Sequence, residues 1–130
     1  MSANITMQKA TPVFVVEAIE PCLNFWVERL GFQLTIQVPH GDSLGFVALQ
    51  SGTVEVMYQT RASVAADIGG KPELSRSSLF CEVEDLEPVI AALNGCEVVV
   101  PRRRAPYGAD EIFVREPGGN VIGFAAFPKA

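Results

Sequence analysis

The sequence lacks any long hydrophobic run. No apolar stretch approaches the roughly 20 residues that a membrane-spanning helix requires. The N-terminal stretch MSANITMQKA also lacks the basic segment followed by an apolar segment that marks a secretory signal peptide. We therefore expect a cytoplasmic protein with no membrane among its partners.

Histidine, cysteine and basic residues are all scarce. An odd number of cysteines in apolar surroundings favours reduced core side chains over a disulfide framework or a metal cluster, and the three are Cys22, Cys81 and Cys96. The 10 basic residues are outnumbered by 15 acids, and this net charge of −5 argues against nucleic acid as a partner. The one basic cluster is interpreted as a solvated loop between two strands, and it consists of Arg102, Arg103 and Arg104.

Apolar residues are plentiful, at 48% of the 130 residues. A chain of this length forms one domain and buries roughly two-thirds of its unfolded surface. We expect a single domain over residues 1–130.

A near-repeat divides the chain into halves. Residues 16–21 read VEAIEP and residues 83–88 read VEDLEP, a spacing of 67 residues. Each copy opens a helical pattern of apolar residues, namely Leu23, Trp26, Val27 and Leu30 in the first and Val89, Ile90 and Leu93 in the second. Gly31 and the pair Asn94-Gly95 supply the stops, and Asp85 is a good N-cap for the second helix. This spacing indicates that Trp26 is a core residue.

Strand-like segments surround both helices in the same order. They are residues 12–16, 32–38, 45–49 and 54–58 in the first half, and 79–83, 96–100, 111–115 and 121–127 in the second. Each half therefore reads β-α-β-β-β, which predicts an α+β fold of two βαβββ modules. The modules span about 10–60 and 77–128, and a linker at about 61–76 joins them.

Two stretches resemble a known family. PVFVVEAIEPCLNFWVERLGF is similar to the first strand and helix of the vicinal oxygen chelate superfamily, and PYGADEIFVREPGGNVIGF is similar to its closing hairpin. That superfamily contains glyoxalase I, extradiol dioxygenases and the fosfomycin and bleomycin resistance proteins. The resemblance implies that each module is a curved mixed sheet with one helix on its convex face. It does not choose an activity, because this scaffold hosts lyases, isomerases, dioxygenases and binding proteins.

The resemblance also identifies the positions where metal-dependent members hold their ion. Carried onto this chain they are Thr11, Glu55, Ser78 and Gly123. Only Glu55 has a side chain that suits a divalent transition metal, and such sites normally need three or more nitrogen, thiolate or carboxylate ligands. The expectation is no metal and no other cofactor. One alternative stays open, an oxygen site for magnesium or calcium that uses Glu82, which shares a strand face with Ser78. The only histidine, His40, is interpreted as a residue of a surface turn.

Strand alternation predicts what the concave face contains. If Glu55 points inward, so does Met57, while Val54, Val56 and Tyr58 turn toward the helix. In the second half, Ser78, Phe80 and Glu82 share a face. A mostly apolar trough with a few acids is typical of a small-molecule site. Desolvation should raise the pKa of Glu55 unless a cation or a hydrogen-bond donor offsets it.

Within the superfamily the pattern most resembles the bleomycin-resistance branch, whose members lack the metal ligands and are acidic dimers that sequester a cationic glycopeptide. Tyr107, in the tripeptide Pro-Tyr-Gly, would be a platform for a flat ring. The candidate ligand-binding residues are thus Thr11, Glu55, Met57, Ser78, Phe80, Glu82 and Tyr107.

Three functions follow as hypotheses. The first is metal-free binding or sequestration of a cationic or aromatic small molecule, as in drug resistance, by a homodimer. The second is a lyase, isomerase or dioxygenase with an atypical metal site. The third is a structural or regulatory dimer without a ligand, whose trough would be filled by its own side chains.

Overall fold

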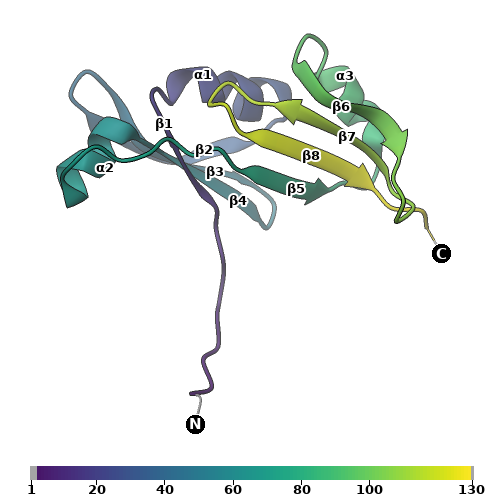
Figure 1. The fold of residues 1–130 in the computed structure, drawn as a ribbon, viewed down its shortest axis with the longest axis horizontal. Helices are drawn as coiled ribbons and strands as arrows, with labels where there is room; N and C mark the ends of the chain where they lie inside the picture. The colour runs from purple at the N-terminus through teal and green to yellow at the C-terminus, as the bar shows by residue number, and fades with distance from the viewer. Residues whose placement is uncertain (1–2, 130) are drawn as a thin grey trace.

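The computed structural model describes residues 3–129, and it contains two separate four-stranded sheets (Figure 1). The N-terminal sheet consists of β1 (Val13–Val16), β2 (Gln33–His40), β3 (Ser43–Ser51) and β4 (Val54–Thr60), in the order β1-β4-β3-β2. The C-terminal sheet consists of β5 (Ser78–Glu82), β6 (Glu97–Arg104), β7 (Asp110–Arg115) and β8 (Val121–Ala126), in the order β5-β8-β7-β6. In each sheet the first strand runs parallel to the fourth and the other pairs are antiparallel. The identical topology confirms the two βαβββ modules.

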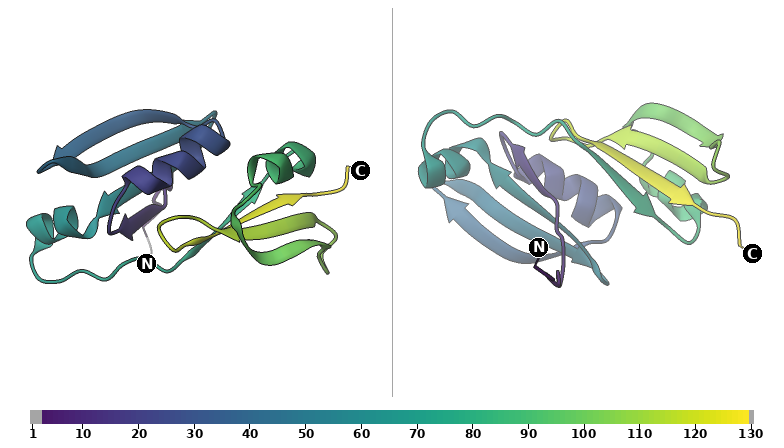
Figure 2. Two further views of the ribbon diagram at one scale, coloured as in Figure 1. Left: turned by 90° about the horizontal axis from the view of Figure 1, so that it is seen from above. Right: turned by 60° about the horizontal axis from the view of Figure 1, so that its bottom comes forward.

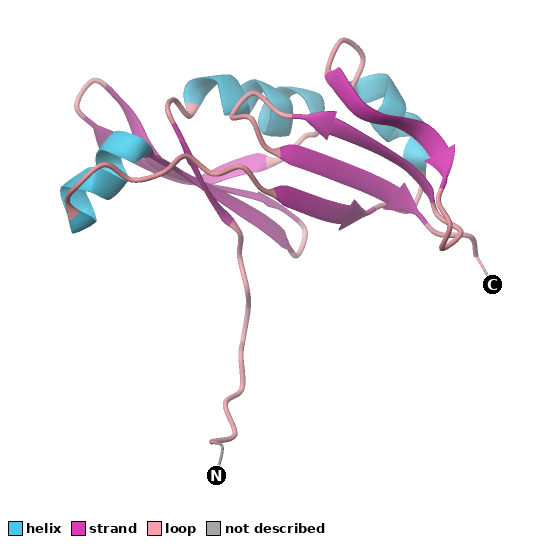
Figure 3. Ribbon diagram, viewed as in Figure 1, coloured by secondary structure: helices cyan, strands magenta, loops and turns pink. Residues whose placement is uncertain are grey.

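Each module has one helix between its first and second strands (Figure 3). In the N-terminal module α1 (Glu20–Leu23) continues directly into a π-helical segment, η1 (Asn24–Arg29), whereas a single α-helix was expected. The predicted apolar face is confirmed, and Trp26 is fully buried beside Phe25. In the C-terminal module α3 (Leu86–Ala92) begins at the predicted N-cap, where the Asp85 carboxylate accepts the backbone N–H of Glu87.

Helices and sheets form layers that leave one side of the molecule bare. In Figure 1, α1 and α3 lie along the upper side, and the extended N-terminal segment leaves from the lower side. The right-hand view in Figure 2 shows the strands of the C-terminal sheet in front of α3. Leu79 and Cys81 pack into the core, so the alternating residue Phe80 lies on the face of β5 that carries no helix. Among residues 3–129, no helix has both the length and the apolar character that crossing a membrane would require.

The linker is more structured than expected, because it contains α2 (Arg61–Ile68). The Thr60 hydroxyl caps this helix by accepting the backbone N–H of Ser63, at 3.1 Å. The guanidinium of Arg61, the first residue of the helix, pairs with Glu17, which follows β1, at 2.9 Å. A side-chain cap and an alanine-rich stretch stabilise a short helix even without a strongly apolar face.

The prediction that Arg102, Arg103 and Arg104 form a loop was wrong, because all three lie in β6. Carboxylates on the neighbouring strand hold two of them there. Arg102 pairs with Asp110 at 2.8 Å, and Arg103 pairs with Glu111 at 2.8 Å. Val54 also differs from expectation, since it is half exposed at the start of β4. His40 is exposed but ends β2 and does not form the turn itself.

A buried polar network joins the two modules. The indole N–H of Trp26 donates to the Tyr58 hydroxyl at 2.8 Å, and this hydroxyl donates to Oε2 of Glu116 at 2.6 Å. Oε1 of Glu116 accepts the backbone N–H of Asn120 at 2.5 Å. Burial, together with the adjacent Glu116 carboxylate, raises the pKa of Tyr58 well above its ordinary range. The network fixes the turn between β7 and β8 against β4, because each of these buried polar groups has a partner.

Candidate functional site

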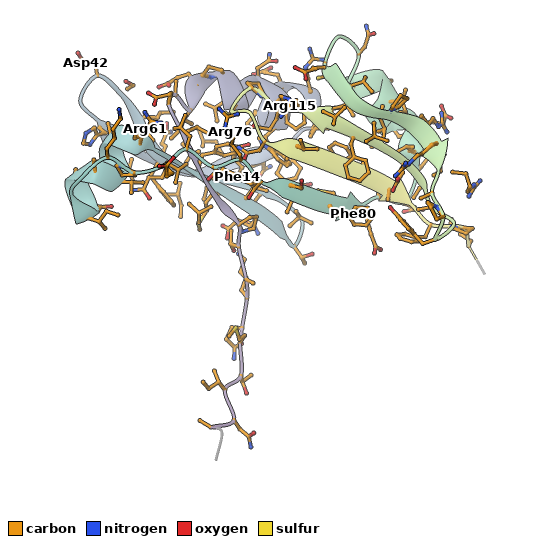
Figure 4. All side chains as sticks on the ribbon, viewed as in Figure 1. Phe14, Asp42, Arg61, Arg76, Phe80 and Arg115 are labelled. Atoms are coloured by element: carbon orange, nitrogen blue, oxygen red, sulfur yellow. The ribbon has the colours of Figure 1, made fainter. Side chains whose placement is uncertain are left out.

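An exposed aromatic cluster lies on the bare face of the C-terminal sheet. Phe80, labelled in Figure 4, is its centre, and its ring centroid is 6.3 Å from those of Tyr107 and Phe113 and 6.4 Å from that of Phe127. The members come from β5, from the loop after β6, from β7 and from the residue that follows β8. Phe80, Tyr107 and Phe127 remain 46%, 54% and 41% exposed. We call these four residues the aromatic cluster.

Phe113 covers the position where the fourth metal ligand of the superfamily was expected. Gly123 lies opposite Phe113 in the ladder, and a Cβ atom at Gly123 would stand only 2.3 Å from Cε2 of the Phe113 ring. Any side chain at this position would require the ring to move. Gly123 therefore not only lacks a metal-binding side chain but also leaves the space that the Phe113 ring occupies.

A buried carboxylate fixes Tyr107. The Glu111 side chain is fully buried on β7, and it accepts hydrogen bonds from the Tyr107 hydroxyl and from Nε of Arg103. The Tyr107 hydrogen bond and then the Arg103 guanidinium hold the pKa of Glu111 below its ordinary value. The same hydrogen bond raises the pKa of Tyr107, because it favours the protonated phenol. Tyr107 thus presents a ring whose orientation is set before any ligand arrives.

The Glu55 carboxylate has a cationic partner, which the sequence alone did not identify. The Lys9 ammonium lies 2.6 Å from its Oε1, and the Thr11 hydroxyl donates to the same oxygen at 3.1 Å. The Lys9 hydrogen bond outweighs desolvation, so the pKa of Glu55 is lowered rather than raised. Thr11 lies just before β1 and serves as a hydrogen-bond donor to Glu55.

A groove of about 360 Å³ brings part of the predicted site together. Glu55, Phe80 and Glu82 all line it, along with Ala10 and Pro12 of the N-terminal segment. Because Phe80 belongs to both the groove and the aromatic cluster, the two are continuous.

The remaining predicted residues lie outside the groove. Met57 is partly buried within the N-terminal sheet, opposite Val13 and Ala48. Ser78 is exposed at the start of β5, opposite Val121. Tyr107 contacts Phe80 in the aromatic cluster.

The residues at the inherited ligand positions do not fit a metal. Thr11 donates its hydroxyl to Glu55, and Phe113 fills the space beside Gly123. Within residues 3–129, no group of three or more histidine, cysteine, aspartate or glutamate side chains is arranged to hold an ion. The donor set that transition metals require is therefore missing from these positions.

Five residues that form or support the groove and the aromatic cluster were not predicted from the sequence. They are Lys9, Arg103, Glu111, Phe113 and Phe127. Strand alternation could have found two of them, because Glu111 and Phe113 share a face in the segment EIFVR. Nothing in the local sequence pairs Lys9 with Glu55, since the two are far apart along the chain.

Comparisons with known proteins agree with this architecture. The family model of the Glyoxalase/Bleomycin resistance protein/Dioxygenase superfamily matches residues 10–124. The chain belongs to this superfamily. A search of curated proteins found no match.

Several solved structures share the fold at low identity. TioX from Micromonospora sp. ML1 has a TM-score of 0.76 at 17% identity, with 91% of this chain and 97% of that chain covered. A glyoxalase/bleomycin resistance protein/dioxygenase from Nocardioides has a TM-score of 0.74 at 17% identity, with coverages of 98% and 88%. Lactoylglutathione lyase from Agrobacterium tumefaciens has a TM-score of 0.73 at 11% identity, with coverages of 92% and 94%. At these identities the likeness concerns the fold, so function has to be argued from the site.

Proposed function

We propose that this protein is a metal-free member of the superfamily that binds and sequesters a small molecule by stacking a flat ring on the aromatic cluster. The carrying observation is that three aromatic side chains, each about half exposed, gather around one point on the bare face. Contiguous exposed apolar surface on a soluble domain commonly marks a binding site. The Phe113 ring over Gly123 supports the metal-free part of the proposal.

The cluster is suited to a planar ligand because its rings are partly fixed in advance. Tyr107 is held by Glu111, and its ring also lies 5.9 Å from that of Phe127. Stacking on such a platform contributes on the order of 0.5–1.5 kcal/mol beyond area burial. Rings that are already oriented lose less conformational entropy on binding. Sequestration of a drug is one form that this function could take.

The test uses two fluorescent probes with one ring system. Dansylamide is neutral, and dansylcadaverine carries the same naphthalene ring on a five-carbon chain ending in an ammonium group. We expect both to bind, and Phe80→Leu should weaken both by about 2- to 12-fold, the factor that corresponds to the loss of aromatic stacking. Ile68→Ala, an exposed apolar residue on α2, is the control and should leave affinity unchanged. Equal affinity in wild type and Phe80→Leu would remove the cluster from the site.

Elemental analysis separates this proposal from the metal-dependent alternative. We expect no stoichiometric zinc, nickel, iron or manganese in the purified protein, and no conversion of the hemithioacetal of methylglyoxal and glutathione. About one equivalent of metal per chain, removed by a chelator together with thermal stability, would favour a lyase, isomerase or dioxygenase instead.

A further inference from the structure

The two side chains of the Lys9–Glu55 ion pair differ in solvent exposure. The Glu55 side chain is only 9% exposed, whereas that of Lys9 is 50% exposed. The carboxylate is therefore a fixed part of the groove wall, and the ammonium reaches it from solvent. A largely buried carboxylate needs a cation or hydrogen-bond donors near it, but it does not require that the cation be Lys9.

The segment that carries Lys9 is weakly attached. Residues 3–10 form no helix or strand, and all of them are exposed. Among the hydrogen bonds and ion pairs formed by residues 3–129, the Lys9–Glu55 pair is the only one that residues 3–10 make. Figure 1 shows this segment extending away from both sheets. Releasing it breaks one ion pair, in which the lysine is half exposed. The Glu55 carboxylate keeps the hydrogen bond from Thr11 but then lacks a cation, which a ligand could supply.

Lys9 also lies beside the ligand surface that we propose. Ala10, the next residue, lines the groove together with Glu55, Phe80 and Glu82. A molecule stacked on Phe80 would therefore extend along the groove toward Glu55. The second acid of the groove, Glu82, is exposed and adds negative charge to that path.

We propose that the ligand carries a protonated amine beside its flat ring, that this amine replaces the Lys9 ammonium at Glu55, and that residues 3–10 are a strap which the ligand displaces. This inference rests on the proposed function and narrows its ligand to aromatic compounds that carry a basic alkylamine. In this arrangement Lys9 compensates the Glu55 carboxylate until the amine of the ligand replaces it.

Binding of the two probes tests the displacement. Dansylcadaverine should bind more tightly than dansylamide, and Lys9→Gln should tighten dansylcadaverine by about 2- to 5-fold, the range for loss of a competing exposed ion pair, without affecting dansylamide. Glu55→Gln should abolish the preference for dansylcadaverine. Lys129→Gln is the matched control for lost charge, since Lys129 is exposed and lies 3.8 Å from Glu84, and it should change nothing.

The rate of trypsin cleavage measures the release of residues 3–10, because cleavage after Lys9 requires that its side chain be free of Glu55. In the absence of any probe, Glu55→Gln should speed cleavage at Lys9 relative to cleavage after Arg76, an exposed arginine that serves as internal reference. Dansylcadaverine should speed the same cleavage in the wild type, and dansylamide should not.

The outcomes separate the two proposals. If dansylamide binds through Phe80, but dansylcadaverine binds no tighter and leaves cleavage at Lys9 unchanged, the displacement is wrong and the proposed function stands. If neither probe binds, both proposals fail. If Glu55→Gln leaves cleavage at Lys9 unchanged, the strap does not depend on this ion pair, and the inference is overturned.

Discussion

At the scale of single residues, buried polar groups constrain the structure, because each one needs a specific hydrogen-bond partner. Tyr58 is the clearest case, since its hydroxyl both accepts from Trp26 and donates to Glu116. The sequence predicted that Trp26 is buried, but it gave no sign of this network. Its members come from β4, from the first helix and from the turn after β7, so only the tertiary structure brings them together.

Tyr58→Phe should destabilise the protein by about 1–3 kcal/mol, because it leaves the Trp26 indole N–H and one oxygen of Glu116 buried without this partner. Urea unfolding measures the change. Ser51→Ala is the control, because it removes a hydroxyl from an exposed side chain at the end of β3, and the effect should be smaller. Equal effects of the two substitutions would show that the buried network contributes no special stability.

Glu111 should make stability depend on acid pH. Its pKa in the folded protein lies below the ordinary value of 4.5. The stability that it contributes is therefore fully present above about pH 4.5 and is lost as pH falls through the folded-state pKa. We expect the free energy of unfolding of Glu111→Gln to differ from that of the wild type at pH 7, and the difference to shrink as pH falls below about 4.5. A difference that stays constant down to pH 3 would contradict this assignment.

At the scale of helices and strands, the elements that follow hydrophobic periodicity were predictable. All eight strands and both module helices were found from alternation, i+3 and i+4 spacing, and Gly or Pro boundaries. The errors occurred where other interactions decide. β6 extends through Arg104 because Asp110 and Glu111 neutralise its positive charges across the ladder. α2 forms because Thr60 caps a stretch that has little apolar pattern.

Thr60→Ala should therefore weaken α2, at about 0.5–2 kcal/mol, the usual contribution of an N-cap side chain. Amide hydrogen exchange in residues 61–68 should rise, while exchange in α3 should not change. Asp85→Ala provides the reciprocal control, because it removes the cap of α3 and leaves that of α2. Uniform loss of protection in both helices after Thr60→Ala would mean that α2 is not a separate unit.

The candidate site was predicted only in part, and the reason is geometric. Alternation predicted that Glu55, Phe80 and Glu82 face the trough, and these three line one groove, whereas Met57, predicted beside Glu55, does not line it. It could not supply Lys9, which approaches from a segment without regular structure, or show that Phe113 fills the space beside Gly123. Side chains that meet across sheets or from the termini have no fixed sequence spacing.

At the scale of the whole molecule, apolar surface remains uncovered on edge strands of both sheets. β2 and β6 each end a sheet within residues 3–129, and each has an unpaired edge. Ile36 and Val38 on β2, and Val98 and Val99 on β6, are large apolar side chains that remain exposed. The N-terminal segment adds Ile5 and Met7, which are also exposed. Unpaired edges with apolar side chains favour association, and twofold dimers are its commonest closed form.

We therefore expect a homodimer of twice the 14.0 kDa chain mass in sedimentation equilibrium at micromolar concentration. Two matched charge variants would locate the contact. Val38→Lys should weaken the dimer if β2 forms the interface, and Val98→Lys should weaken it if β6 does, because a lysine on a paired edge is desolvated without a partner. Deletion of residues 3–8 tests the remaining route, in which Ile5 and Met7 contact the second copy. A 14.0 kDa monomer in the wild type would refute the dimer and leave the exposed apolar side chains to be explained by ligand binding alone.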